Sequence, residues 1–177
     1  RLFVAGGGEG ASLTSPDGEA WTRRASGTDL ALAAVTWGDG EFLAVGPITF
    51  LLASSDGQNW TVRDTGLTPF PYAHLSGIAY NGGHYLINGS GGDIRESGFL
   101  GRSQDGVAWH WTSFAVVGGL RWLGTEFFAS SAQKEILTSK NGKDWAVETV
   151  PEPAYFNAAA VGESVTQCVG WPRAYQK

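Results

Sequence analysis

The stretch Ser15-Pro16-Asp17-Gly18-Glu19-Ala20-Trp21 decides the fold, because the chain repeats its pattern at intervals of roughly 40 residues. Each copy reads serine, any residue, aspartate or asparagine, glycine, two further residues and tryptophan. The other three copies are Ser54-Ser55-Asp56-Gly57-Gln58-Asn59-Trp60, Ser103-Gln104-Asp105-Gly106-Val107-Ala108-Trp109 and Ser139-Lys140-Asn141-Gly142-Lys143-Asp144-Trp145.

The residue types of this motif are those of a tight turn between two strands. An Asp or Asn side chain accepts hydrogen bonds from the backbone N–H groups that follow it, and a Ser hydroxyl adds a second local bond. Glycine supplies a positive φ without steric cost. The tryptophan then opens the next strand and offers a large ring for packing against a neighbouring repeat. We therefore predict a structural role for all four copies, and neither a catalytic nor a metal-binding one.

A second pattern lies between the motifs and predicts hairpins. Residues 35–46, 78–89 and 120–131 each consist of an apolar run, a turn and another apolar run, and 159–169 is a degraded copy. Asn81-Gly82 is among the strongest short-range hairpin signals. Each repeat then contains four short strands, and four-stranded units of about 40 residues are typical of β-propeller blades.

The four motifs resemble the Asp-box, or BNR, repeats of sialidase-like β-propellers. The common family form has one more residue between the aspartate and the aromatic residue, and Asn141 replaces the aspartate in the last copy. The resemblance implies a propeller fold but not a function, since the same repeat occurs in enzymes, receptors and assembly factors.

The repeats predict one all-β domain over residues 1–177, with repeats at approximately 1–26, 30–66, 75–114 and 116–150 and a partial repeat at 156–177. We align 2–6 with the strand at 42–46, so the first repeat lacks its innermost strand. Residues 157–161 can supply that strand and close a four-bladed ring, which would remove an open sheet edge. The alternative is part of a larger propeller, because 165–170 resembles another second strand; the chain then either continues into further blades, or an oligomer or a partner chain completes the ring.

Composition excludes several classes of function. The net charge of −5 argues against nucleic-acid binding, and no apolar run is long enough to span a membrane. The three histidines are scattered and the single cysteine cannot form an intrachain disulfide, so we expect neither a metal site nor a cofactor. The β-rich, Trp- and Gly-rich composition and the family resemblance favour a secreted or periplasmic protein.

Candidate binding residues lie in two long connections, on the face opposite the turn motifs. Insertions on one face of a repeat protein are the usual place for added function. One connection is aromatic and proline-stiffened, and the other is glycine-rich and charged. The candidates are Phe70, Tyr72, His74, Asp93, Arg95 and Glu96.

These residues favour a non-catalytic recognition or scaffold module that binds a glycan or a protein, with aromatic rings stacking on sugars and charged groups bonding hydroxyls. A structural part of a larger assembly is the first alternative. A sialidase-like glycoside hydrolase is the second, and it is disfavoured because the family's Arg-Ile-Pro motif is missing.

Overall fold

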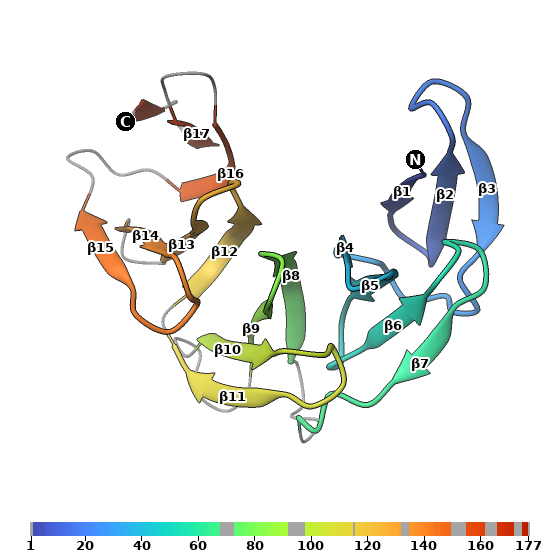
Figure 1. Ribbon diagram of the computed structural model, residues 1–177, viewed down its shortest axis with the longest axis horizontal. Helices are drawn as coiled ribbons and strands as arrows, with labels where there is room; N and C mark the ends of the chain where they lie inside the picture. Colours follow the sequence, from blue (N-terminus) through green and yellow to red (C-terminus); the bar gives the residue numbers. More distant parts are fainter. Residues whose placement is uncertain are drawn as a thin grey trace.

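The computed structural model describes residues 2–67, 73–91, 98–114, 116–131, 135–149, 155–161, 166–171 and 175–176. These residues form eighteen β-strands in five antiparallel sheets and no helix. The described part of the chain accordingly has no helix that could cross a membrane. Figure 1 shows the sheets arranged side by side along an open arc, with the two ends of the chain at the two ends of the arc.

The strands follow one another in chain order within each sheet. The first sheet contains β1 (Phe3–Gly6), β2 (Ala11–Ser15) and β3 (Thr22–Ala25). The second contains β4 (Ala34–Gly38), β5 (Glu41–Val45), β6 (Leu51–Ser54) and β7 (Thr61–Arg63). The third contains β8 (His74–Tyr80), β9 (Tyr85–Ser90), β10 (Gly98–Ser103) and β11 (His110–Ser113). The fourth contains β12 (Val116–Trp122), β13 (Phe127–Ser131), β14 (Glu135–Ser139) and β15 (Ala146–Thr149). The fifth contains β16 (Tyr155–Val161), β17 (Thr166–Trp171) and β18 (Tyr175–Gln176).

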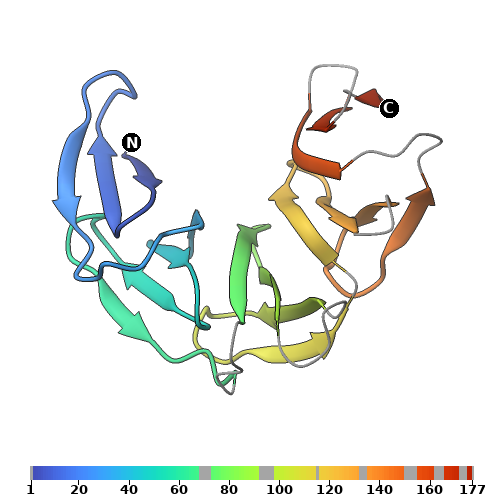
Figure 2. The same ribbon diagram turned by 180° about the vertical axis from the view of Figure 1, so that it is seen from behind.

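This arrangement confirms the predicted fold class, a β-propeller built from antiparallel four-stranded blades. The strands β4, β8, β12 and β16 line the concave side of the arc, while β3, β7, β11 and β15 lie on its outer side (Figure 2). The predicted hairpin at Asn81-Gly82 joins β8 to β9, with Tyr80 opposite Tyr85. Each turn motif connects the last two strands of its sheet.

The strand that was expected to close a four-bladed ring is paired elsewhere. Residues 157–161 belong to β16, which pairs with β17 and not with β1. Residues 166–170 of that sequence therefore lie in β17, the second strand of a fifth sheet, as the alternative interpretation required. A hairpin partner only a few residues away costs less chain entropy than a partner at the opposite end of the chain.

The sequence alignment of the first repeat was wrong by one residue. In the structure Phe3 lies opposite Ser15, just as Phe42 lies opposite Ser54. Gly7, rather than Gly6, therefore corresponds to Gly46. The run of three glycines at 6–8 offers two equally good matches to Gly46, and only the strand register distinguishes them.

The hydrophobic core lies between neighbouring sheets. Leu43 and Leu51 of the second sheet pack with Tyr85 and Ile87 of the third. The next interface repeats this arrangement, since Leu86 and Leu100 of the third sheet share one cluster with Phe127 and Leu137 of the fourth. Each sheet therefore buries an apolar face against its neighbour, which is the main source of stability in this fold.

The glycines of the second, third and fourth turn motifs sit against the preceding sheet. A Cβ atom built on Gly106 would lie 2.8 Å from Leu43 Cδ1, and one on Gly142 would lie 2.7 Å from Leu86 Cδ1. Gly57 approaches Val4 in the same way, at 2.8 Å from its Cγ2 atom. These three glycines have φ values of +69° and lack the space for a side chain. The turn motif thus also forms part of the contact between sheets.

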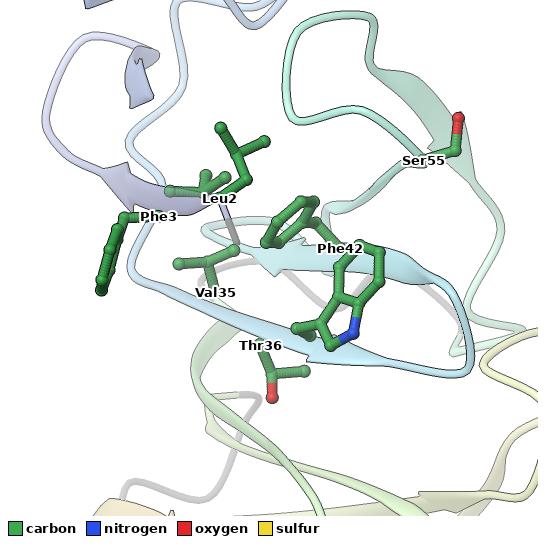
Figure 3. Close-up of a pocket in the computed structure, with 8 residues that line it drawn as sticks. Leu2, Phe3, Val35, Thr36, Phe42 and Ser55 are labelled. Atoms are coloured by element: carbon green, nitrogen blue, oxygen red, sulfur yellow. The ribbon is translucent and has the colours of Figure 1, made fainter. Parts of the chain in front are cut away.

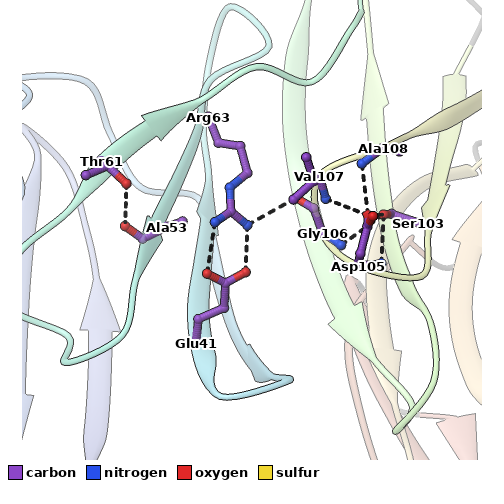
Figure 4. A network of polar contacts seen from close by, with 9 residues as sticks. All are labelled: Glu41, Ala53, Thr61, Arg63, Ser103, Asp105, Gly106, Val107 and Ala108. Carbon is purple, nitrogen blue, oxygen red and sulfur yellow. Dashed lines mark hydrogen bonds and ion pairs between the residues drawn. The ribbon is translucent and has the colours of Figure 1, made fainter.

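An ion pair reinforces the contact between the second and third sheets (Figure 4). Arg63 donates from both terminal nitrogens to the two carboxylate oxygens of Glu41, at 2.6 and 2.9 Å. The same guanidinium donates to the backbone oxygen of Gly106 at 3.3 Å. The hydrogen bonds to Glu41 raise the pKa of Arg63 above its ordinary value. The pair therefore links β5 and β7 to the turn of the next sheet.

We expect a double-mutant cycle of Arg63→Met and Glu41→Gln to give a coupling energy of about 1 kcal/mol at low salt. The two-pronged geometry favours the upper part of the range for surface pairs, while partial exposure and salt screening limit it. Urea denaturation of the four proteins measures the coupling. A value indistinguishable from zero at low salt would show that the pair contributes nothing to stability.

Candidate functional site

The four turn motifs share one pattern of local hydrogen bonds. In the third copy, Asp105 Oδ1 accepts hydrogen bonds from the backbone N–H groups of Val107 and Ala108, each at 2.9 Å. The Ser103 hydroxyl donates to the same carboxylate and accepts from the N–H of Gly106. The fourth copy makes equivalent bonds through the amide oxygen of Asn141. The polar groups of these motifs are therefore used within their own turns.

The three aspartates of the motifs are strong hydrogen-bond acceptors. Backbone N–H donors hold the pKa of the Asp17, Asp56 and Asp105 carboxyl groups below its ordinary value, since they favour the ionised form. A pKa that is lower in the folded state than in the unfolded state stabilises the fold at pH values above the unfolded-state pKa of about 3.9. That contribution is lost as the pH falls through the lower folded pKa.

We expect Asp105→Asn to fold well at neutral pH, because Asn141 makes the same bonds in the fourth copy. The wild type should be the more stable of the two at pH 7, and its advantage should disappear as the pH falls below about 4. Asp105→Ala, which removes the acceptor, should have the lowest melting temperature at pH 7. Thermal melts of the three proteins between pH 7 and pH 2 check this, and a gap between aspartate and asparagine that does not change with pH would contradict it.

A cavity of about 590 Å³ lies between the first two sheets, where the concave side of the arc meets β1 (Figure 3). Its lining comes from β1 and the residue before it, from β4 and β5, and from the turn after β6, and it is apolar apart from Thr36 and Ser55. Trp37 and Phe42 form its aromatic wall, with ring centroids 4.4 Å apart in an edge-to-face arrangement. Apolar cavities with aromatic walls are the usual form of ligand sites in proteins.

A second hollow of about 490 Å³ adjoins the first cavity along β4. It lies where the inner strands of the second, third and fourth sheets converge, and Val35 and Thr36 line both spaces. Tyr80 and Trp122 contribute aromatic rings to it, and Arg121 contributes a positive charge. We call the two spaces together the concave-side groove. It presents three aromatic side chains along the inside of the arc, Trp37, Tyr80 and Trp122, one from each of the second, third and fourth sheets.

Trp37 is the most exposed aromatic residue of this groove. Its side chain is 51% exposed. The corresponding residues of the next two sheets, Tyr80 and Trp122, are partly buried. They contact the rings of Tyr85 and Phe127 as Trp37 contacts that of Phe42. A large exposed indole beside an apolar cavity is typical of a binding surface rather than of a core.

Most of the residues that the sequence singled out for binding lie outside the described residues. Phe70, Tyr72, Asp93, Arg95 and Glu96 belong to this group. His74 is described: it is exposed, it begins β8, and its backbone pairs with Ser90 and bridges to Pro47. Within the described part of the chain, no group of three or more His, Cys, Asp or Glu residues could hold a metal ion.

Sequence reasoning missed the groove residues. It placed Trp37 and Tyr80 only within the apolar runs of the predicted hairpins at 35–46 and 78–89, and did not consider which space those residues face. The useful signal was present, since Trp37, Tyr80 and Trp122 lie at or next to the ends of the innermost strands of three repeats. Aligned innermost strands of a propeller face a shared central space, so a conspicuous aromatic residue at one position in successive repeats indicates a lined groove.

No family model matches the chain, and neither does any curated protein. The solved structures that are similar to it over nearly the whole length include the following two. One is YCF48 bound to a D1 peptide, with 18% sequence identity and a TM-score of 0.65, matched over 94% of this chain and 56% of that one. The other is KlHsv2 with loop 6CD replaced by a Gly-Ser linker, with 11% identity and a TM-score of 0.54, matched over 99% and 64%.

The chain therefore spans less than two thirds of the length of either of these proteins. Both neighbours are β-propellers. At such low sequence identity the similarity establishes the fold alone. The geometry of the sheets and these two comparisons agree that the chain has the β-propeller fold.

Proposed function

We propose that this chain is a non-catalytic, protein-binding β-propeller that holds a peptide segment of its partner in the concave-side groove. The exposure of Trp37 carries the proposal. Exposing an indole to water is costly unless a partner covers it, and burying such a ring is worth about 1.5–3 kcal/mol. Tryptophan is also among the residues that most often dominate binding energy at protein interfaces.

The composition of the groove supports a peptide rather than a highly charged ligand. The cavity beside Trp37 is lined by apolar side chains and two hydroxyl-bearing residues. Arg121 is placed at the far end of the groove, where it can attract an acidic side chain or a carboxylate. The overall negative charge of the chain disfavours nucleic acid as the occupant.

The similar proteins provide a second line of support. YCF48 binds a D1 peptide, and it has the same fold. Propellers commonly place their binding surfaces around the central space, so a peptide ligand is consistent with the architecture. Membership of the Asp-box family, a glycan ligand and a secreted or periplasmic location stay predictions from the sequence.

The proposal is tested with the 177-residue protein on a peptide array and, in parallel, on a glycan array. We expect binding to peptides that contain apolar and aromatic residues. Affinities of the best peptides are then measured by fluorescence anisotropy for the wild type and for Trp37→Ala, which should bind at least about tenfold more weakly. The matched control is Val62→Ala, which truncates a side chain that is 73% exposed on the outer strand β7.

The control variant should bind as the wild type does. Loss of binding in both variants, or in neither, would contradict the proposed site. Binding of glycans without any binding of peptides would overturn the proposed function and favour the glycan ligand instead.

A further inference from the structure

The sequence contains three asparagine–glycine pairs, and the fold holds each of them differently. They are Asn81-Gly82, Asn88-Gly89 and Asn141-Gly142. In such a pair the backbone nitrogen of the glycine can attack the side-chain amide carbon of the asparagine, because glycine has no side chain to obstruct the approach. In a folded protein this reaction requires a glycine N–H that is free to react and an asparagine amide that is polarised for attack.

Asn81 meets both requirements. It precedes the exposed turn between β8 and β9, and its Oδ1 atom accepts hydrogen bonds from the backbone N–H groups of Gly83 and His84, at 3.0 and 2.7 Å. Two donors at a carbonyl oxygen stabilise the negative charge that develops there when a nucleophile attacks the carbon. Gly82 is exposed, and within the described residues its N–H makes no hydrogen bond. The turn therefore has a free nucleophile next to an activated amide.

Asn141 has the same activation but its nucleophile is held. Its Oδ1 atom accepts hydrogen bonds from the N–H groups of Lys143 and Asp144, at 2.8 and 2.9 Å. The N–H of Gly142, however, donates to the Ser139 hydroxyl at 2.9 Å in a buried position. Attack by this nitrogen would break a buried hydrogen bond, which is costly because the hydroxyl is left without its donor.

Asn88 meets neither requirement. It is fully buried in β9, which pairs with β8 on one side and with β10 on the other. Its Oδ1 atom has no hydrogen-bond donor among the described residues, so its amide is not polarised for attack. Burial also keeps away the water that the second step of the reaction consumes. The fold therefore separates three chemically similar pairs into one reactive pair and two protected pairs.

We propose that Asn81 is a site of spontaneous deamidation in the folded protein. The Gly82 nitrogen forms a bond to Asn81 Cγ, and the bond from Cγ to Nδ2 breaks. The proton of the attacking N–H passes through solvent to the departing nitrogen, which leaves as ammonia. Water then opens the resulting succinimide ring at one of its two carbonyl carbons, which gives aspartate or isoaspartate. The reaction needs water alone as a second reactant, and nothing is oxidised or reduced.

The modification alters the contact between the third and fourth sheets. Asn81 Nδ2 donates to the backbone oxygen of Lys140 at 3.5 Å, and this bond is lost with the ammonia. Burial, together with the charge of Arg102, lowers the pKa of His84 in the same turn, so a guanidinium lies near. Deamidation therefore removes a hydrogen bond between two sheets and places a new carboxylate close to a cation.

The two products should differ in stability. Aspartate keeps an oxygen that can accept the bonds from Gly83 and His84. Isoaspartate adds a carbon to the main chain inside the turn, which is closed by a hydrogen bond of 3.2 Å from Asn81 N–H to the backbone oxygen of His84. We expect the isoaspartate form to melt at a lower temperature than either the aspartate form or the unmodified protein.

The experiment follows all three pairs in one sample. The 177-residue protein is incubated at neutral pH and physiological temperature, and tandem mass spectrometry of its proteolytic peptides measures aspartate and isoaspartate at each asparagine. A parallel sample in denaturing urea gives the rates without the fold, which should be similar for the three pairs. In the folded protein we expect Asn81 to react fastest, and Asn141 and Asn88 to react at least about tenfold more slowly.

Two substitutions test the proposed chemistry. Gly82→Ala should slow the reaction at Asn81 at least about tenfold, because a methyl group obstructs the attacking nitrogen, although the fold has space for it. The matched control is Gly124→Ala, which adds a methyl group at another open turn position with positive φ and should leave the rate at Asn81 unchanged. Ser139→Ala frees the N–H of Gly142 and should accelerate the reaction at Asn141.

The other results would overturn the inference. Equal rates at Asn81 and Asn141 in the folded protein would show that the fold does not select between them. A folded protein that stays unmodified at Asn81, while the urea sample reacts, would show that the turn protects the pair. If Ser139→Ala is poorly folded, the comparison of Gly82→Ala with Gly124→Ala still decides, since equal rates at Asn81 in these two variants exclude Gly82 as the nucleophile.

Discussion

Replacing Phe127 by alanine is expected to lower the free energy of unfolding by about 3–5 kcal/mol, the usual cost of truncating a buried aromatic residue. Phe127 is fully buried at the interface of the third and fourth sheets, in one cluster with Leu86 and Leu137. Its ring also contacts Trp122, with centroids 4.9 Å apart. The substitution leaves a cavity between the two sheets. Filling it would require strands to shift out of their hydrogen-bonded positions within each sheet.

Urea denaturation of the wild type, Phe127→Ala and Val147→Ala measures this effect. Val147 belongs to the same sheet but is 57% exposed on the outer strand β15, so its truncation should change the free energy by less than about 0.5 kcal/mol. Similar losses for the two variants would mean that the sheets do not pack through the face that contains Phe127.

Gly106→Ala is expected to destabilise the protein by about 2–4 kcal/mol, from two separate causes. The residue has a φ of +69°, where a side chain costs roughly 1 kcal/mol or more. The new Cβ atom would also lie 2.8 Å from Leu43 Cδ1 in a fully buried part of the core, and such overpacking typically costs 1–3 kcal/mol.

The control that separates these causes is Gly82→Ala. Gly82 has a φ of +89° in the turn between β8 and β9, but nothing lies within 4 Å of the position that its Cβ would take. It should therefore show only the backbone cost of about 1 kcal/mol. The additional loss of unfolding free energy in Gly106→Ala, compared with Gly82→Ala, measures the steric contact between the turn and the preceding sheet. Leu43→Ala removes the atom that the new Cβ would meet, so the double variant should show a smaller additional loss. Equal effects at both glycines would rule out that contact.

The local features of this fold could be predicted from the sequence because their causes are local. The hydrogen bonds of Asp105 and Gly106 in the turn join residues that are only two or three positions apart in the sequence. Residue types and their spacing are therefore enough to predict the turn. The hairpin at Asn81-Gly82 follows from the same kind of reasoning. The second role of Gly106, against Leu43 of another sheet, depends on how the repeats stack and is invisible in any single motif.

Two predictions about the ends of the repeats depended on choices that sequence alone does not determine. The glycines at 6–8 allow two alignments of the first strand, and the correct one follows from the pairing of Phe3 with Ser15. Residues 157–161 are equally suitable as a partner for β1 or for β17, and the structure has the nearby partner.

The candidate site also depends on the arrangement of the sheets, which the sequence did not predict. Prediction from loop length and residue type pointed to residues such as Tyr72 and Arg95, which lie outside the described residues, so that prediction is untested. The concave-side groove is formed by side chains from several strands that are far apart in the sequence, among them Val4, Trp37 and Trp122. Each of these residues looks like an ordinary strand residue by itself, and only the arrangement of the sheets brings them to one surface.

A crystal structure of the 177-residue protein with its best array peptide tests the central claim most directly. The account predicts that the peptide lies in the concave-side groove, with a side chain in the cavity next to Trp37. A peptide bound on the face of the long connections, with Trp37 still exposed to solvent, would contradict it.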